Sequence, residues 1–221
     1  MKNYIQALKI LKKGKIFIKD EITESSKSLN RVISENIYSK ENYPSNDNSS
    51  FDGYIIKSSN TKNLSKKKPK FFKIIGSIAA GDKIKIRKIK KFQTMQIMTG
   101  GIIPQNFDTI IPNEKVTFYP DRENAKYILI NKKIRKYQNI RFKGSDYKFN
   151  DLVIKKGTLI QSKHIMALKT LGIEKIKVKR VPNILFFSTG NEITDKKKIS
   201  NFKVRNSNYY YINSLKKKFS I

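Results

Sequence analysis

The middle of the chain, from residue 55 to residue 156, is a series of short apolar β segments separated by turns. Three such segments stand out: 71–75, 109–111 and 127–130. The isoleucines at 84, 86 and 89 suggest a further one. Short segments with irregular spacing and no internal repeat are typical of a small β domain. Residues 62–70 are rich in Lys and Ser, and we expect an exposed linker there.

Apolar residues spaced three and four apart predict helices on both sides of this β region. They cover the following segments: 4–11, 25–36 and 162–171. The second helix can be capped by Ser25 or Ser26. The third can begin at Ser162, and Gly172 is placed to end it. A strand is predicted directly afterwards, over residues 173–178.

Residues 183–221 begin like an α/β domain. The apolar run 184–187 leads into a small-residue loop, 188–192. A fully apolar strand before such a loop is typical of a buried parallel strand. A helix capped near Asn206 is predicted over residues 209–217. One strand and one helix cannot enclose a core, so we expect only the start of a domain.

The charge of the chain is strongly positive, with 48 Lys and Arg against 17 Asp and Glu, a net +31. Such a chain gains affinity for phosphate backbones by releasing counterions, so a basic nucleic-acid-binding module is one interpretation. However, the Lys are spread along the whole chain and accompany many Asn and Ile, which is typical of an AT-rich coding sequence. This pattern favours composition as the cause, and nonspecific polyanion binding is expected in either case.

Location is indicated by what the sequence lacks. No apolar run approaches the roughly 18 residues of a membrane span, and the N-terminus has no signal-peptide pattern. The absence of Cys excludes disulfides and thiolate metal sites, and it fits a reducing cytosol. We therefore expect a soluble, cytoplasmic protein with no membrane partner.

The polar residues that could form a functional site are mainly carboxylates and hydroxyls, which bind through oxygen. The single His164 lies within a predicted helix, where a structural role is expected, and one His cannot form a histidine metal cluster. Carboxylates and hydroxyls next to basic groups suit hard cations such as Mg²⁺ and oxyanions. Four loops have this character: 47–54, 97–101, 139–146 and 188–192. Singly, each loop is a weak signal.

Together, these loops resemble the signatures of the molybdopterin molybdenumtransferase family, which includes bacterial MoeA and the E domain of gephyrin. The family patterns are DNSAMDGYA, IMTGAxxPxGxDAVVxxE, NIRxxGxD, GDxVxxxGTxL and STGDEL. The matching segments occur in the same order: 47–54, 97–114, 139–146, 150–173 and 188–193. The chain departs from these patterns at Asn46, in place of an aromatic residue, at Ser50 and Phe51, in place of Ala-Met, and at Asn191, in place of Asp.

The resemblance implies an α+β fold with three parts. Residues 1–19 and 151–182 would form an elongated, discontinuous α/β domain I, and residues 20–150 a mostly β domain II. Residues 183–221 would be the truncated start of the α/β molybdopterin-binding domain, one strand and one helix. In the family the working unit is a homodimer whose active site lies between the third domain of one subunit and the second domain of the other.

The resemblance also implies an activity: molybdenum from molybdate enters adenylylated molybdopterin with the help of Mg²⁺, and AMP is released. Three carboxylates would be catalytic or metal-binding: Asp52, Asp146 and Glu192. Four further residues would hold substrate oxyanions: Thr99, Arg141, Ser188 and Thr189. Implied partners are a second copy of the chain and a molybdopterin adenylyltransferase.

Two alternatives stay open beside this activity. Because the chain resembles only the first half of the family, we expect it to be inactive alone. It would then be a non-catalytic remnant, or a split-gene subunit that needs a separate C-terminal half. The basic nucleic-acid-binding module is the other alternative.

Overall fold

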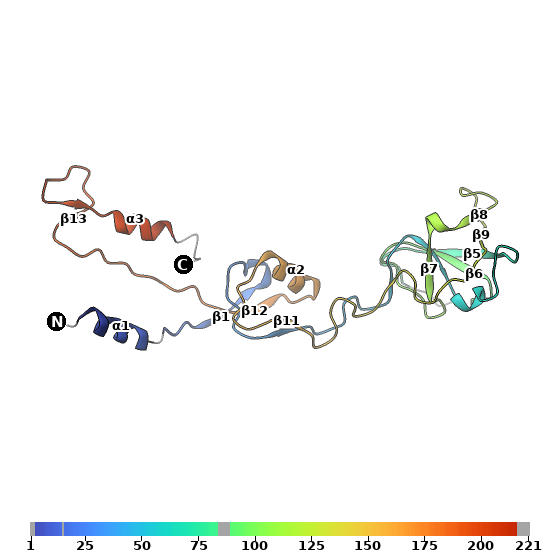
Figure 1. Ribbon diagram of the computed structural model, residues 1–221, viewed down its shortest axis with the longest axis horizontal. Coiled ribbons are helices and arrows are strands. Elements are labelled where there is room, and N and C mark those ends of the chain that lie inside the picture. Colours follow the sequence, from blue (N-terminus) through green and yellow to red (C-terminus); the bar gives the residue numbers. More distant parts are fainter. Residues whose placement is uncertain (1–2, 15, 84–88, 216–221) are drawn as a thin grey trace. The chain divides into compact units, whose positions relative to one another are not determined.

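The structure is a computed structural model that describes residues 3–14, 16–83 and 89–215 (Figure 1). It divides into two compact units, each with its own apolar core. Unit 1 comprises residues 1–38 and 152–221, and unit 2 comprises residues 39–151. Most of the segment expected around isoleucines 84, 86 and 89 lies outside the described residues.

Six strands form the sheet of unit 2: β4 (Gly53–Ile56), β5 (Lys70–Ile78), β6 (Gln93–Ile97), β7 (Thr109–Pro112), β8 (Thr117–Tyr119) and β9 (Tyr127–Ile130). Their order is β7-β4-β6-β5-β9-β8. Neighbours are antiparallel except for β5 and β6, which are parallel. The strands predicted at 71–75, 109–111 and 127–130 are confirmed as parts of β5, β7 and β9.

Strand β4 lies between β6 and β7 and is buried along its whole length. Its first residue, Gly53, has no room for a side chain, because a Cβ atom would lie 2.2 Å from the carbonyl oxygen of Ile111. The strand contributes to both apolar cores of the unit, one through Tyr54 and Ile56 and the other through Ile55. The sheet therefore fixes the position of the polar loop that leads into β4.

Short elements complete unit 2. Strand β3 (Asn48–Ser49) pairs antiparallel with β10 (Ile140–Arg141), and two 3-10 turns, η2 (Ser58–Thr61) and η3 (Asn113–Lys115), connect longer strands. Residues 62–70 are exposed apart from Leu64, as expected for a linker.

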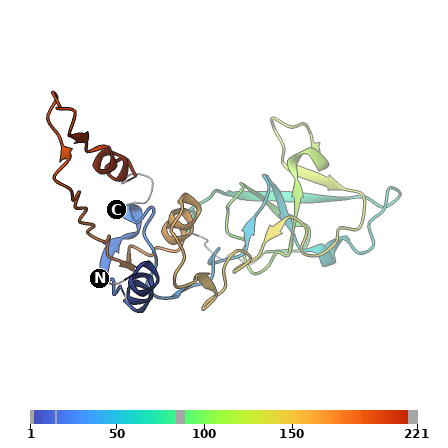
Figure 2. The same ribbon diagram turned by 60° about the vertical axis from the view of Figure 1, so that its left-hand side comes forward.

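The core of unit 1 is built from two strand pairs and a helix. Strand β1 (Asp20–Glu24) pairs antiparallel with β12 (Lys175–Lys179), and β2 (Ile37–Tyr38) pairs with β11 (Leu152–Ile154). Helix α2 (Ser162–Thr170) lies beside these strands and contributes Leu168 to their core (Figure 2).

The predicted helix over 162–171 is confirmed as α2, although its N-cap is Gln161 and not Ser162. The backbone N–H of Gln161 donates to Nδ1 of His164 over 3.0 Å, and Gly172 follows the helix with φ +64°. His164 thus closes a capping box, in agreement with a structural role.

The helix predicted over residues 25–36 is wrong. Only a single 3-10 turn forms, η1 (Ser25–Lys27), and its end is held by the Ser28 hydroxyl, which donates to the Ser25 carbonyl over 2.6 Å. Beyond it residues 29–30 form a turn, and Val32 and Ile33 then form bridges with Leu159 and Val178. β-Branched residues favour such pairing, and serine hydroxyls compete with helical backbone bonds.

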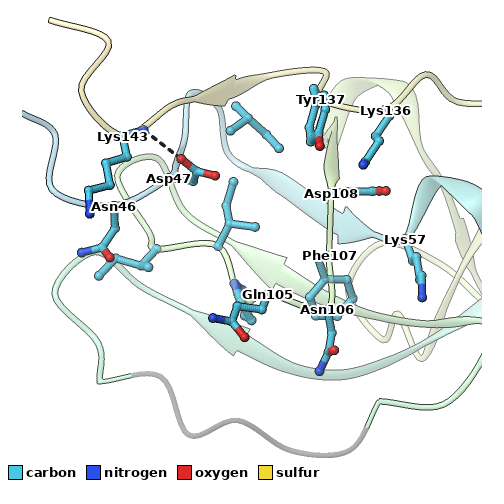
Figure 3. Close-up of a pocket in the computed structure, with 14 residues that line it drawn as sticks. Asn46, Asp47, Lys57, Gln105, Asn106, Phe107, Asp108, Lys136, Tyr137 and Lys143 are labelled. Atoms are coloured by element: carbon cyan, nitrogen blue, oxygen red, sulfur yellow. Dashed lines mark hydrogen bonds between the residues drawn. The ribbon is translucent and has the colours of Figure 1, made fainter. Parts of the chain in front are cut away.

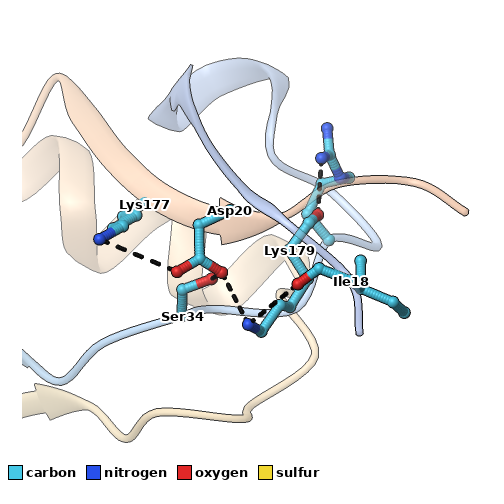
Figure 4. A network of polar contacts seen from close by, with 6 residues as sticks. Ile18, Asp20, Ser34, Lys177 and Lys179 are labelled. Carbon is cyan, nitrogen blue, oxygen red and sulfur yellow. Dashed lines mark hydrogen bonds and ion pairs between the residues drawn. The ribbon is translucent and has the colours of Figure 1, made fainter. Parts of the chain in front are cut away.

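The domain boundary expected at residue 20 also differs from the two units, which separate after residue 38. Residues 20–38 belong with unit 1 because β1 pairs with β12. Figure 4 shows the side chains that reinforce this pair: Asp20 accepts from Ser34 Oγ over 2.8 Å and from Lys179 Nζ over 2.7 Å. Lys179 first, and then Ser34, lower the pKa of Asp20.

The N-terminal helix buries none of its side chains. The predicted N-terminal helix is confirmed as α1 (Tyr4–Lys13), capped by Asn3, but none of its residues is buried. No helix among the described residues is long and apolar enough to cross a membrane.

The apolar strand predicted over residues 184–187 does not form. Leu185 and Phe187 are 82% and 77% exposed, and Figure 2 draws the segment as an irregular chain. No strand among the described residues pairs with it, so the segment is part of no sheet. Beyond it, β13 (Ile193–Thr194) pairs parallel with β14 (Val204–Arg205). The last predicted helix is confirmed as α3 (Ser207–Ser214), capped by Asn206, and the last two residues of the predicted range, 216–217, lie outside the described residues.

Candidate functional site

Three of the four polar loops meet in unit 2, around strand β3. The backbone N–H of Ser49 donates to the carbonyl of Gly101, and the N–H of Gly100 donates to the carbonyl of Ser49, each over 2.9 Å. On its other side β3 pairs with β10. Loops 47–54, 97–101 and 139–146 therefore form one hydrogen-bonded assembly.

Asp52 is the best-defined carboxylate of this assembly. Its Oδ1 accepts from the backbone N–H of Thr99 over 2.6 Å and from the Thr99 hydroxyl over 2.8 Å. These two hydrogen bonds, the backbone bond first, lower the pKa of Asp52. Its Oδ2 accepts no hydrogen bond from the described part of the chain, and the side chain is exposed. Asp52 is thus an ionised, oriented carboxylate with one oxygen available.

The glycine pair after Thr99 shapes the turn that presents these donors. Gly100 has a φ of +81°, which side-chain-bearing residues rarely adopt. A Cβ atom on Gly101 would lie 2.8 Å from Cγ1 of Ile97 and 2.9 Å from the Met98 carbonyl oxygen. The turn therefore requires both glycines in order to direct the Thr99 N–H at Asp52.

Arg141 and Asp146, to which the family resemblance assigns separate roles, form an ion pair with each other. Asp146 also accepts from the Ser145 hydroxyl over 3.1 Å. Arg141, followed by Ser145, lowers the pKa of Asp146, and Asp146 raises the pKa of Arg141. Both oxygens of Asp146 are therefore occupied. An oxyanion would reach Arg141 through guanidinium donors that Asp146 does not use, or by displacing it.

A pocket of about 560 Å³ adjoins these loops (Figure 3). Asp47 lines it and accepts from the backbone N–H of Lys143 over 2.8 Å. Lys57, Lys136 and Lys143 line it as well, and none of them forms a salt bridge within the described residues. The volume is typical of small-molecule sites. Lys57 and Lys136 had not been singled out, because lysine is abundant along the whole sequence and carries no positional signal.

The fourth loop, 188–192, belongs to unit 1. Ser188 Oγ donates to Asn206 Oδ1 over 2.7 Å, and Thr189 and Glu192 are exposed. The structure therefore brings Asp52, Thr99, Arg141 and Asp146 into one assembly, and it places the other three expected site residues in the other unit.

A magnesium site can be tested against the carboxylates themselves. Within the described ranges, no group of three or more His, Cys, Asp or Glu side chains could hold a metal ion. Mg²⁺ is commonly held by only one or two carboxylates, together with waters and phosphate oxygens. Asp52, with its available Oδ2, fits such a role. Asp146, with both oxygens engaged, fits it less well.

Known proteins resemble this chain over most of its length. Residues 3–172 match the model of the MoeA N-terminal region (domain I and II). The chain belongs to the MoeA family. Molybdopterin molybdenumtransferase from Staphylococcus epidermidis is 30% identical to it over 217 residues, which cover 98% of this chain and 50% of the relative. The enzyme of the same name from Staphylococcus aureus is 32% identical, over 88% of this chain and 45% of the relative.

Solved structures of the MoeA family share the fold. A molybdopterin biosynthesis MoeA protein from Pyrococcus horikoshii matches with a TM-score of 0.84 and 27% identity, over 98% of this chain and 56% of that chain. A second structure of the protein from this organism gives a TM-score of 0.81 and 31% identity, over 94% and 52%. The chain thus spans about half the length of the MoeA relatives that it matches.

Proposed function

We propose that this chain supplies the first two domains of a molybdopterin molybdenumtransferase in molybdenum cofactor biosynthesis. In this proposal, molybdenum from molybdate enters adenylylated molybdopterin and AMP is released. The observation that carries the proposal is the assembly of three family-signature loops around β3, in a chain whose residues 3–172 match the MoeA N-terminal region.

Each side chain of the assembly has a role in this proposal. Asp52 is ionised near neutral pH, Thr99 lowers its pKa further and orients it, and its Oδ2 accepts no hydrogen bond from the described residues. It would hold Mg²⁺, which supplies charge neutralisation beside phosphate oxygens. Arg141 and Lys143 carry the cationic groups suited to molybdate or phosphate. Asp146 then acts as a positioning residue that fixes the Arg141 guanidinium.

The remaining expected residues and partners belong to the same proposal. Glu192, Ser188 and Thr189 would act at the pterin side of the site, together with the half of the relatives that this chain does not cover. That half would be supplied by a separate C-terminal chain or by a longer form of this one. The working unit would be a cytoplasmic homodimer that receives its substrate from a molybdopterin adenylyltransferase.

The test is reconstitution of an apo-molybdoenzyme with adenylylated molybdopterin, molybdate and Mg²⁺. The 221-residue chain alone is expected to give no activity, because one side of the site is missing and a substrate cannot be oriented by half a cleft. The chain fused to the uncovered half of the Staphylococcus epidermidis relative is expected to restore activity. A fusion that melts cooperatively but stays inactive would contradict the proposal, as would turnover by the chain alone at the rate of a full-length relative.

A further inference from the structure

The sheet of unit 2 has an aromatic outer face as well as an apolar inner face. Three neighbouring strands at one end of the sheet, β5, β9 and β8, direct alternate residues, such as Phe72 and Ile128, into the core. The residues between them point outward, and the register places them side by side on β5, β9 and β8 (Figure 1): Phe71, Lys73, Tyr127, Leu129, Thr117 and Tyr119. None of these six residues belongs to the signature loops.

Three aromatic rings cluster on this outer face. The ring centroids of Phe71 and Tyr119 lie 5.0 Å apart, and those of Phe71 and Tyr127 lie 6.1 Å apart. Phe71 is 45% exposed and Tyr119 is 53% exposed. Single exposed apolar residues are ordinary on a protein surface, whereas these three rings are contiguous.

The charge around the rings indicates the kind of partner. Lys73 pairs with Tyr127 in the register, none of the six outward residues is acidic, and the whole chain carries a net charge of +31. Aromatic rings are enriched and lysine is depleted in protein–protein interfaces, so the cationic charge beside the rings is what distinguishes this surface from such an interface. Exposed aromatic rings beside a lysine, on a strongly cationic chain, are the arrangement that stacks nucleobases and attracts phosphates.

We infer that the outer face of β5, β9 and β8 binds single-stranded nucleic acid. Bases stack on Phe71 and Tyr119, and Lys73 contacts the phosphate backbone. Because stacking uses only the π face of a base, binding has little sequence preference. This binding is independent of molybdenum insertion, since it uses neither the signature loops nor the pocket of Figure 3.

The test is the fluorescence anisotropy of a labelled 12-nucleotide uridine oligomer titrated with the full chain. Tyr119→Ala is expected to weaken binding about tenfold, because a stacking platform is lost. Phe71→Tyr keeps a ring and is expected to bind like the parent chain. Phe149→Ala is the matched control: this side chain is also in unit 2 and is 67% exposed, but it lies outside the outer face, so affinity should not change.

Salt dependence separates stacking from simple charge attraction. Lys73→Gln is expected to reduce the slope of log affinity against log salt by about 0.7, whereas Tyr119→Ala leaves the slope unchanged. Three results would overturn the inference: no binding of the oligomer, equal affinity of Tyr119→Ala and the parent, or displacement of the oligomer by polyphosphate as effectively as by unlabelled oligomer. Retained thermal melts of the variants exclude unfolding as the cause of a loss.

Discussion

Among individual residues, Thr99 controls the ionisation of Asp52. It donates to one carboxylate oxygen through both its backbone N–H and its hydroxyl. We predict that Thr99→Val raises the pKa of Asp52 toward its ordinary value, because the hydroxyl bond is lost and only the backbone bond remains. Carboxyl ¹³C NMR titration measures this pKa. Thr117→Val, at an exposed position away from Asp52, should leave it unchanged.

The same hydrogen bonds link the stability of the fold to pH. The folded pKa of Asp52 is below its unfolded value, so its contribution is present above the unfolded pKa and is lost as pH falls through the folded one. The gap in melting temperature between the parent chain and Asp52→Asn should therefore be constant above about pH 5 and shrink below about pH 4. A gap in melting temperature that widens on acidification would contradict the lowered pKa of Asp52 in the folded chain.

Gly53 is predicted to be the least replaceable residue of the signature loops. Gly53→Ala places a methyl group against the Ile111 carbonyl, so β4 and β7 must separate. We expect a loss of about 1–3 kcal/mol in the free energy of unfolding, measured in denaturant. Ser50→Ala, an exposed change in the same loop, should cost less than about 0.5 kcal/mol. Equal losses in the two variants would contradict this account.

Among the elements, the sequence predicted those whose apolar side chains alternate or recur at helical spacing, such as β9 and α2. It did not predict β1, whose sequence Asp20–Glu24 contains one apolar residue, Ile22, and that residue is exposed. This strand is held by pairing and ion pairs with β12, about 150 residues away along the chain. Local periodicity does not identify pairing partners that are distant in the sequence.

The candidate site was predictable to a similar degree. Family signatures located the loops, and with them Asp52, Thr99, Arg141 and Asp146. The sequence did not predict the ion pair between Arg141 and Asp146 or the lysines that line the pocket, and the structure shows both. Spacing along a chain says which residues are near in sequence, but it does not say which charges meet in space.

The C-terminal segment makes the clearest prediction for an element. Its apolar residues 184–187 are exposed and lie in no strand, so their burial contributes little to the fold. Deleting residues 183–221 should leave the thermal melt of the remainder almost unchanged and improve solubility. Deleting residues 175–221 also removes β12 and should unfold unit 1. Resistance of the segment after Pro182 to limited proteolysis would argue that it is packed.

For the molecule as a whole, we predict self-association through α1. None of the residues of this helix is buried, although Ile5 and Leu11 are apolar and exposed. Covering them would stabilise the helix, since short helices depend on packing of an apolar face. Sedimentation velocity at moderate salt should show a dimer for the parent chain and a monomer for the Ile5→Glu, Leu11→Glu double variant. Gln6→Glu, on the side of the same helix away from Ile5 and Leu11, is the control and should remain dimeric.

The most direct test of the central claim is AMP release from adenylylated molybdopterin by the chain fused to the uncovered half of the Staphylococcus epidermidis relative. The reaction would contain molybdate and Mg²⁺, and AMP would be separated and quantified by chromatography. We predict that Asp52→Ala abolishes AMP release although the variant still folds and melts cooperatively. Asp121→Ala, an exposed aspartate whose pKa is also lowered by local hydrogen bonds, should retain full activity. Equal AMP release by the two variants would contradict the assignment of this assembly as the catalytic contribution of the chain.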